Sequence, residues 1–316
     1  EFITLPGRDI WESIVRHSRH ATFFHTPAWA TVLERTYPAY RNNTRAFIFE
    51  SGSRAILPLM VEKESRGLFK KAKHKSMPLG VYGGIVSDAQ LTADEREAIF
   101  RCLAASDISD LKVVAAPLED QGYPDSFKRA ALFTHLLYLE RDFDRLASRF
   151  SRGQKSNIRQ ARKKGVTVRT AGAAEDYEHY LRMYQDTLKR WGAQGGVRYP
   201  RELFLNLLEA HNPDIRLWLA EKEAQPIAGV VALYCNETVL YWHGCSLQDY
   251  FDHYPNNLLH AEIIRDACDR GYARYDLSPS GGYEGVIKFK DSFSAKRVDF
   301  NAYHWKKRAV RIGAHR

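Results

Sequence analysis

The sequence lacks several features that would place it at once in a common class of protein. Its four cysteines form no Cys-x-x-Cys pair, and no Cys/His spacing is typical of zinc ligands. No apolar run approaches the roughly 20 residues needed to span a bilayer, and no signal peptide is visible. Because reduced, buried thiols are typical of cytoplasmic proteins, we expect the protein in the cytoplasm or at the inner face of the membrane.

Motifs of several enzyme classes are also missing. The sequence has no P-loop, no dinucleotide-binding fingerprint and no metal-binding motif. It has no nucleophile elbow and no Ser-His-Asp order, which argues against a covalent acyl-enzyme. We therefore expect neither a bound metal nor a tightly bound cofactor.

Acidic residues are absent between Arg145 and Ala174, although the segment is rich in Lys and Arg. Apolar residues follow an approximate helical spacing through it, at Leu146, Phe150, Ile158 and Ala161. This pattern predicts a helix that packs one face on the core and exposes a cationic face.

A cationic face of this kind attracts phosphate groups, and the net charge of +9 points the same way. The candidate phosphate-binding residues are Arg152, Lys155 and Arg159. We expect an anionic partner, which could be a nucleotide-linked or lipid-linked precursor, a tRNA or an acidic membrane surface. A solvated helix surface with no ligand would have the same sequence pattern.

The 316 residues are enough for two domains, and the chain repeats one order of elements. Two apolar runs around a polar turn come first, and a helix and a strand follow. The order occurs at 46–61, 92–105 and 111–115, and again at 217–233, 257–270 and 274–277. This repeat predicts tandem α/β domains, residues 1–142 and 143–316, with mixed β-sheets flanked by helices.

The stretch 241–293 gathers polar residues where predicted strands end. An aromatic strand closes at Tyr241-Trp242-His243, and Asn256 or Asn257 can cap a helix that stops at Gly271. A short strand, Arg274 to Leu277, then leads to a glycine loop and to the basic-aromatic cluster Lys288-Phe289-Lys290. In α/β sheets, ligands usually bind at such strand ends.

Several segments resemble the FemAB-like branch of the Gcn5-related N-acyltransferases, which includes aminoacyl-tRNA-dependent peptidoglycan bridge enzymes and relatives linked to exopolysaccharide synthesis. The matching pieces are Phe24 to Trp29, Ser156 to Gly165, Tyr241 to Gly244, the loop and helix from Pro255, Gly271-Tyr272, Tyr275-Asp276, Gly281-Gly282 and Gly285…Phe289-Lys290…Phe293. The sequence departs from the family's Asp-Phe-Gly-Gly at Asp276-Leu277-Ser278-Pro279. The resemblance implies acyl or aminoacyl transfer to an amine of an envelope or polysaccharide precursor. It also implies an acceptor-shaping first domain and a reaction centre in the second.

Such a transfer needs a fixed cation or donor for the negative oxygen that forms on the carbonyl, and a route for the proton of the attacking ammonium. Lys290 matches the family's Phe-Lys, whose lysine is associated with the reaction centre. Asp276 and His243 are the candidate bases, although a structural carboxylate and a buried histidine are equally compatible with the sequence. The other substrate-binding candidates lie in the same loops and strand ends: Tyr241, Trp242, Tyr254, Asn256, Asn257, Gly281, Gly282 and Lys288.

The loop 252–257 contains no glycine, whereas many acyl-CoA-dependent members of the superfamily hold the pyrophosphate in a glycine-rich turn there. This favours an aminoacyl-tRNA donor over acyl-CoA. Two alternatives stay open. One is an acyl-CoA-dependent N-acetyltransferase that acts on an amino sugar or another small amine, and the other is a non-catalytic RNA-binding module built around 145–164.

Overall fold

The computed structural model describes residues 1–63, 72–119, 122–192 and 197–307. The chain forms two compact units. The first comprises Glu1–Ser18, Phe24–Ala131 and Phe300–Arg316, and the second comprises Arg19–Phe23 and Leu132–Asp299. Strands β9 (Lys128–Tyr138) and β15 (Lys296–Lys306) each pass from one unit into the other. The observed division therefore differs from the predicted one after residue 142.

The first unit contains short strands and three α-helices among its described residues. Its helices are α1 (Arg8–His17), α2 (Pro27–Thr36), α3 (Ala93–Ala105) and the 3-10 turn η1 (Phe23–His25). Its remaining strands are β1 (Phe2–Thr4), β2 (Tyr40–Asn42), β3 (Arg45–Ile48), β4 (Arg54–Leu57), β5 (Met60–Lys63), β6 (Ala72–Ser76), β7 (Val86–Ser87) and β8 (Asp110–Val114). Strands β1, β3, β4 and β7 form one sheet, and β15, β8, β6, β5 and β2 follow one another in a second.

The predicted hairpin at 46–61 is only partly right. Strands β3 and β4 pair antiparallel, with Ile48 opposite Arg54. The second run, however, is two strands, because Pro58 cannot donate a backbone hydrogen bond and the chain leaves the first sheet there. Residues from Met60 onward pair with β2 and β6 in the other sheet.

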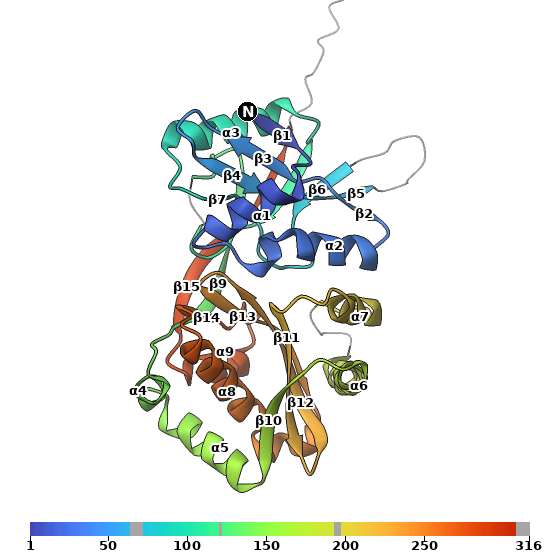
Figure 1. The fold of residues 1–316 in the computed structure, drawn as a ribbon, viewed down its shortest axis with the longest axis vertical. Helices are drawn as coiled ribbons and strands as arrows, with labels where there is room; N and C mark the ends of the chain where they lie inside the picture. Colours follow the sequence, from blue (N-terminus) through green and yellow to red (C-terminus); the bar gives the residue numbers. More distant parts are fainter. Residues whose placement is uncertain (64–71, 120–121, 193–196, 308–316) are drawn as a thin grey trace, which may run out of the picture. The chain divides into compact units, whose positions relative to one another are not determined.

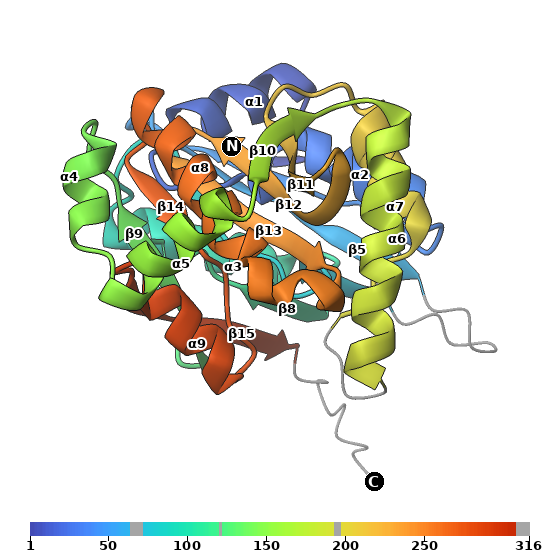
Figure 2. The same ribbon diagram turned by 90° about the horizontal axis from the view of Figure 1, so that it is seen from below.

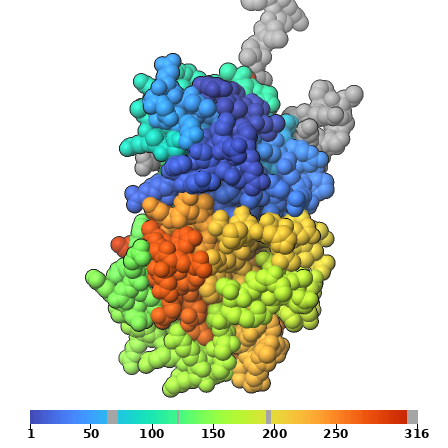
Figure 3. Space-filling model, viewed as in Figure 1, coloured from blue at the N-terminus to red at the C-terminus, as the bar shows by residue number. Residues whose placement is uncertain are grey.

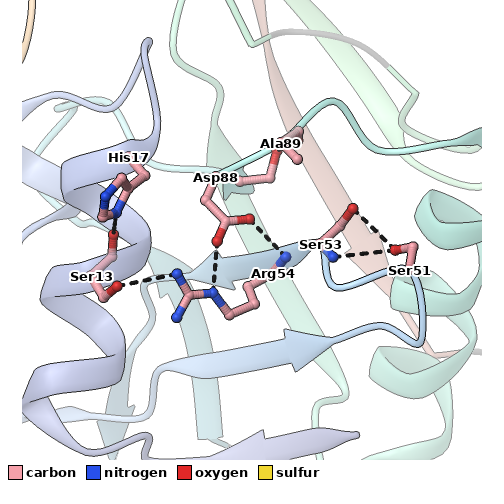
Figure 4. A network of polar contacts seen from close by, with 8 residues as sticks. Ser13, His17, Ser51, Ser53, Arg54, Asp88 and Ala89 are labelled. Atoms are coloured by element: carbon pink, nitrogen blue, oxygen red, sulfur yellow. Dashed lines mark hydrogen bonds and ion pairs between the residues drawn. The ribbon is translucent and has the colours of Figure 1, made fainter.

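Polar contacts tie the helices of this unit to its strands. Figure 4 shows Arg54 of β4, whose Nε donates to Asp88 Oδ2 at 2.6 Å and whose terminal nitrogen donates to Ser13 Oγ of α1 at 3.1 Å. The predicted start of α3 is confirmed, since Glu95 N donates to Thr92 Oγ1 and Thr92 N donates to Glu95 Oε2.

The second unit is a twisted sheet with helices on both faces. The strand order is β10-β11-β12-β13-β14-β9. The strands are β10 (Val166–Ala171), β11 (Ile215–Lys222), β12 (Gln225–Cys235), β13 (Thr238–Ser246) and β14 (Arg274–Asp276). The helices are α4 (Phe143–Ser148), α5 (Arg152–Lys163), α6 (Ala174–Trp191), α7 (Arg201–Glu209), η3 (Gln248–His253), α8 (Pro255–Asp269) and α9 (Glu284–Asp291).

Figures 1 and 2 show α6 and α7 on one face of this sheet and α5 and α8 on the other. Helix α8 packs on the inner strands, and Leu259, Ile263 and Val230 belong to the buried hydrophobic cluster that they form. The predicted class of mixed α/β sheets flanked by helices is confirmed. Among the described residues, no helix combines the length and the apolar character that crossing a membrane requires.

Helix α8 begins differently from the prediction and ends as predicted. It starts at Pro255, and the residue before it, Tyr254, is left-handed with φ 54°. The expected cap at Asn256 or Asn257 is therefore wrong, because both residues lie inside the first turn. At the other end, Gly271 has φ +78°, and its N–H donates to the Cys268 carbonyl.

Candidate functional site

The middle of the second unit's sheet contains a split between two parallel strands. Strands β13 and β14 pair over three residues of each, from Thr238 opposite Arg274 to Leu240 opposite Asp276. Strand β13 then continues along β12 as far as Ser246, while the chain beyond Asp276 turns into a loop. The edge of β13 from Tyr241 onward is thus unpaired with β14, at the strand ends where the sequence predicts a ligand site.

A bulge in β13 lies at the same place. Ala232 of β12 faces Tyr241, but Val231 faces His243, so Trp242 is an extra residue. The bulge changes which side of the sheet the side chains face. The Tyr241 ring lies 4.6 Å from His260 of α8, whereas the Trp242 ring lies 5.9 Å from Phe204 of α7.

Lys290, the residue that the family resemblance associates with the reaction centre, is enclosed by the protein. Its side chain is 2% exposed, and Nζ donates to the Ser278 carbonyl oxygen at 2.5 Å. Burial lowers the pKa of Lys290 to about 8, against the opposing effect of the Asp276 carboxylate. Phe289, the residue before Lys290, is partly buried and packs against His260 and Phe293.

Asp276 is fully buried at the end of β14. Its Oδ1 accepts hydrogen bonds from Thr134 Oγ1 at 2.7 Å and from Ser278 N at 2.8 Å. Ser278, with φ 60°, also donates from Oγ to the Tyr241 carbonyl at 2.5 Å. These contacts connect the two separated strands, so Asp276 holds the loop in place as well as lying near Lys290.

The loop between β14 and α9 includes Gly281 and Gly282, with φ +59° and +82°. A side chain would be strained in this backbone conformation. Lys288, two residues from Lys290, is exposed, and its Nζ lies 3.6 Å from Glu284. The two lysines thus have opposite environments on one short helix, and Lys288, a predicted substrate-binding residue, is exposed to solvent.

His243 is buried in an aromatic enclosure on the α6–α7 side of the sheet. Its ring lies 4.6 Å from Tyr184 and 5.1 Å from Phe204, and the Tyr180 hydroxyl lies 2.5 Å from Nδ1. Burial lowers the pKa of His243 to about 3. A histidine with so low a pKa accepts a proton poorly, which counts against its predicted role as a general base.

The predicted cationic helix forms as α5, after a break that Ser151 caps through Gln154 N. Figure 3 shows this segment, in green, on the surface. Arg152, Lys155 and Arg159 are exposed on one face, and Lys163 extends the same stripe. Arg152, Arg159 and Lys163 have no ion-pair partner in the part of the chain that the structure describes, while Lys155 Nζ donates to the Ser148 carbonyl.

The predicted residues at the start of α8 are mostly occupied by contacts within the protein. Asn256 Nδ2 donates to Ser246 Oγ at 3.2 Å, and Asn257 Nδ2 donates to Gln154 Oε1 of α5 at 2.7 Å. Tyr254 lies under Lys164, whose Nζ is 5.8 Å from the ring centroid. The two asparagines therefore fix the ends of β13 and α5 against α8.

Sequence reasoning missed the partners that define these environments. Tyr180, Thr134 and Gln154 contact His243, Asp276 and Asn257, respectively. Gln154 lies within the Arg/Lys-rich segment and could have been noted as a buried position on the inner helix face. Tyr180 and Thr134 have no local signal, because their partners lie 63 and 142 residues away along the chain.

Comparison with protein families identifies this region. Residues 148–291, which include α5, the β13–β14 split and Lys290, match the family described as acetyltransferase (GNAT) domain. This segment is similar to a GNAT domain over its whole length. The resemblance inferred from the sequence is thereby confirmed at the level of the superfamily. No sequence among curated proteins matches the chain.

Solved structures extend the likeness to nearly the whole chain. FemX is 13% identical with a TM-score of 0.73, and the match covers 97% of each chain. L-PGS from Bacillus licheniformis is 10% identical with a TM-score of 0.61, over 96% of this chain and 94% of that one. At such low identity the likeness concerns the fold, which is a FemX-like tandem GNAT fold.

Proposed function

We propose that the protein is an acyltransferase or aminoacyltransferase that forms an amide on an amine of a cell-envelope or polysaccharide precursor. The observation that carries the proposal is the split between β13 and β14 in a GNAT-like domain, with buried Lys290 beside it. A parallel strand pair that separates offers unpaired backbone groups to an extended acyl donor, in the way that an edge strand does.

Attack of the amine on the carbonyl places negative charge on the carbonyl oxygen, and a fixed cation stabilises that charge. We assign this role to Lys290. Asp276 favours the charged form of Lys290, and the Ser278 carbonyl holds its Nζ in place. The cation is therefore preorganised, which is what electrostatic stabilisation of a transition state requires.

For the donor, the start of α8 favours aminoacyl-tRNA over acyl-CoA. Pro255 has no N–H, and the N–H groups of Asn257 and Leu258 donate to the Tyr254 carbonyl. Asn256 is then the one residue of 255–258 whose N–H has no acceptor among the described residues, a poor cradle for a pyrophosphate. The exposed cations of α5 supply a larger surface for the phosphates of an RNA.

For the acceptor, we propose a nucleotide-linked or lipid-linked precursor, bound in the cytoplasm at or near the inner face of the membrane. The different roles predicted for the two units are also part of this proposal. The second unit carries the reaction centre, and the first shapes the acceptor site.

The GNAT domain match also favours a second candidate, an acyl-CoA-dependent N-acetyltransferase acting on an amino sugar or another small amine. Mass spectrometry of ligands that co-purify with the protein separates the two. A uridine nucleotide or aminoacyl-tRNA supports the first proposal, and bound CoA supports the second. Tight, salt-sensitive RNA binding by a protein that forms no amide with either donor would make it an RNA-binding module instead.

A further inference from the structure

The hydrogen bonding around His243 determines which of its ring nitrogens carries a proton. The ring is 7% exposed and is enclosed by Tyr184, Phe204 and Tyr199, whose ring centroids lie 4.6, 5.1 and 5.5 Å away. All of these neighbours are uncharged aromatic rings. The other titratable groups of β13, Cys245 and Tyr241, are a buried thiol and a buried phenol, and burial raises the pKa of both.

Tyr180 is the hydrogen-bond partner of His243. Its hydroxyl lies 2.5 Å from Nδ1, and its side chain is completely buried. Burial raises the pKa of Tyr180 well above its usual value, so the phenol keeps its proton. The other group that interacts with this hydroxyl is the Cys245 thiol, and a thiol sulfur is only a weak acceptor.

A buried O–H group requires an acceptor, and for Tyr180 the stronger of the two available acceptors is Nδ1, at 2.5 Å. If Nδ1 carried the ring proton instead, the phenol would have to accept from it and donate to the weakly accepting Cys245 sulfur, a less favourable arrangement. A neutral imidazole has one N–H group, so in His243 the proton is on Nε2. Because burial lowers the pKa of His243 to about 3, the ring stays in this neutral form across the physiological range.

Nε2–H has no hydrogen-bond acceptor among the described residues. It lies on the residue that follows the bulge, on the part of β13 that has separated from β14. Nε2 is not among the fully buried polar atoms that lack a partner, so the remaining 7% exposure of His243 leaves this N–H within reach of a ligand oxygen.

We propose that His243 is a neutral hydrogen-bond donor, through Nε2–H, to an oxygen of the substrate, and that Tyr180 is the positioning residue that fixes this tautomer. The inference rests on the proposed function, in which the carbonyl oxygen of the acyl group gains negative charge. It replaces the role of general base predicted for His243.

The test uses full-length protein labelled with ¹⁵N-histidine, whose NMR spectrum distinguishes a protonated from an unprotonated ring nitrogen. The signal of His243 is identified by its loss in His243→Gln. We expect a protonated Nε2 and an unprotonated Nδ1, unchanged between pH 5 and pH 9. In Tyr180→Phe the donor to Nδ1 is gone, and we expect a minor fraction of the Nδ1–H tautomer to appear beside Nε2–H. Tyr184→Phe keeps its ring against His243 and should leave the tautomer unchanged.

Turnover provides the second readout. We expect His243→Phe to lose about 10²-fold in kcat, and His243→Gln, which keeps an N–H group, to retain more activity. An active enzyme whose Nδ1 is protonated, or whose tautomer is the same in Tyr180→Phe, overturns the inference and leaves the proposed function standing. The expected tautomer in a protein that forms no amide overturns the proposed function, and with it the part of the inference that concerns the substrate.

Discussion

At the scale of single residues, two lysines of one helix show how strongly environment determines chemistry. Lys290 is 2% exposed, and its Nζ donates a hydrogen bond to the Ser278 carbonyl oxygen. The side chain of Lys288, in contrast, is 75% exposed. Only the buried ammonium has a fixed position and a low-dielectric surrounding, in which a charge acts strongly on its neighbours. The two residues therefore form a matched pair for mutagenesis.

We expect Lys290→Met to lower turnover by about 10²-fold or more, because methionine fills much of the space of the stem without its charge. Lys288→Met should retain wild-type turnover within about twofold, since an exposed, solvated charge contributes little. The measurement is steady-state kcat for both variants, with melting temperatures as the control for folding. If Lys290→Met retained wild-type turnover, the reaction centre would not include this lysine.

The buried charge of Lys290 should also change how the free energy of unfolding depends on pH. Its pKa is about 8 in the folded protein and 10.5 as the ordinary value. Below pH 8 the lysine is charged in both states, and its buried charge destabilises the fold by about 3 kcal/mol. Between pH 8 and 10.5 the unfolded state binds more protons, so stability rises with pH.

Urea unfolding of wild type and Lys290→Met at pH 7 and pH 10 tests this. The methionine variant should be more stable than wild type at pH 7, and this difference in unfolding free energy should shrink by about 2 to 3 kcal/mol at pH 10. A difference that stays constant between the two pH values would show that the charge of Lys290 is not penalised in the folded protein.

The sequence predicted which residues carry polar groups at the strand ends, but it did not predict their partners. Lys290, Asp276 and His243 could be selected because their residue types and positions suit acyl transfer. Their environments depend on Tyr180 and Thr134, which reach them only through the tertiary fold. Residue type therefore selected the candidate residues, and long-range packing determines the environment of each.

At the scale of elements, periodicity predicted helices well and strand register poorly. The inner face of the basic segment, with Ile158 and Ala161, is buried as predicted. The bulge at Trp242 could not be predicted, because the register of β13 is defined only by its pairing with β12. That single extra residue places His243 against α6 and α7.

The cationic stripe of α5 gives a prediction at this scale. We expect Arg152→Glu with Arg159→Glu to weaken binding of an RNA-borne donor and to reduce the slope of log K against log salt by about 1 to 2, since two phosphate contacts are lost. Arg8→Glu with Arg101→Glu changes the net charge equally at exposed positions of the first unit and should leave the slope nearly unchanged. Filter binding across a salt series measures both. Equal slopes for the two double variants would make α5 an ordinary solvated helix.

At the scale of the whole molecule, the tandem fold could be predicted from the repeated order of apolar runs, helices and strands, together with the family resemblance. The boundary between the units could not be predicted, because it lies inside two continuous strands, β9 and β15. The amino-acid composition does not change within a continuous strand, so the sequence gives no sign of the boundary. The net charge of +9 fits an anionic substrate, but charge alone does not distinguish a transferase from a protein that only binds RNA.

Amide formation itself tests the central claim most directly. Purified protein is given labelled aminoacyl-tRNA or labelled acetyl-CoA, together with nucleotide-linked amino sugars and muramyl peptides, and the products are read by mass spectrometry. The account predicts a new amide from aminoacyl-tRNA, reduced about 10²-fold in Lys290→Met and little affected in Lys288→Met. Salt-sensitive RNA binding by a folded protein that gives no amide with either donor would contradict it.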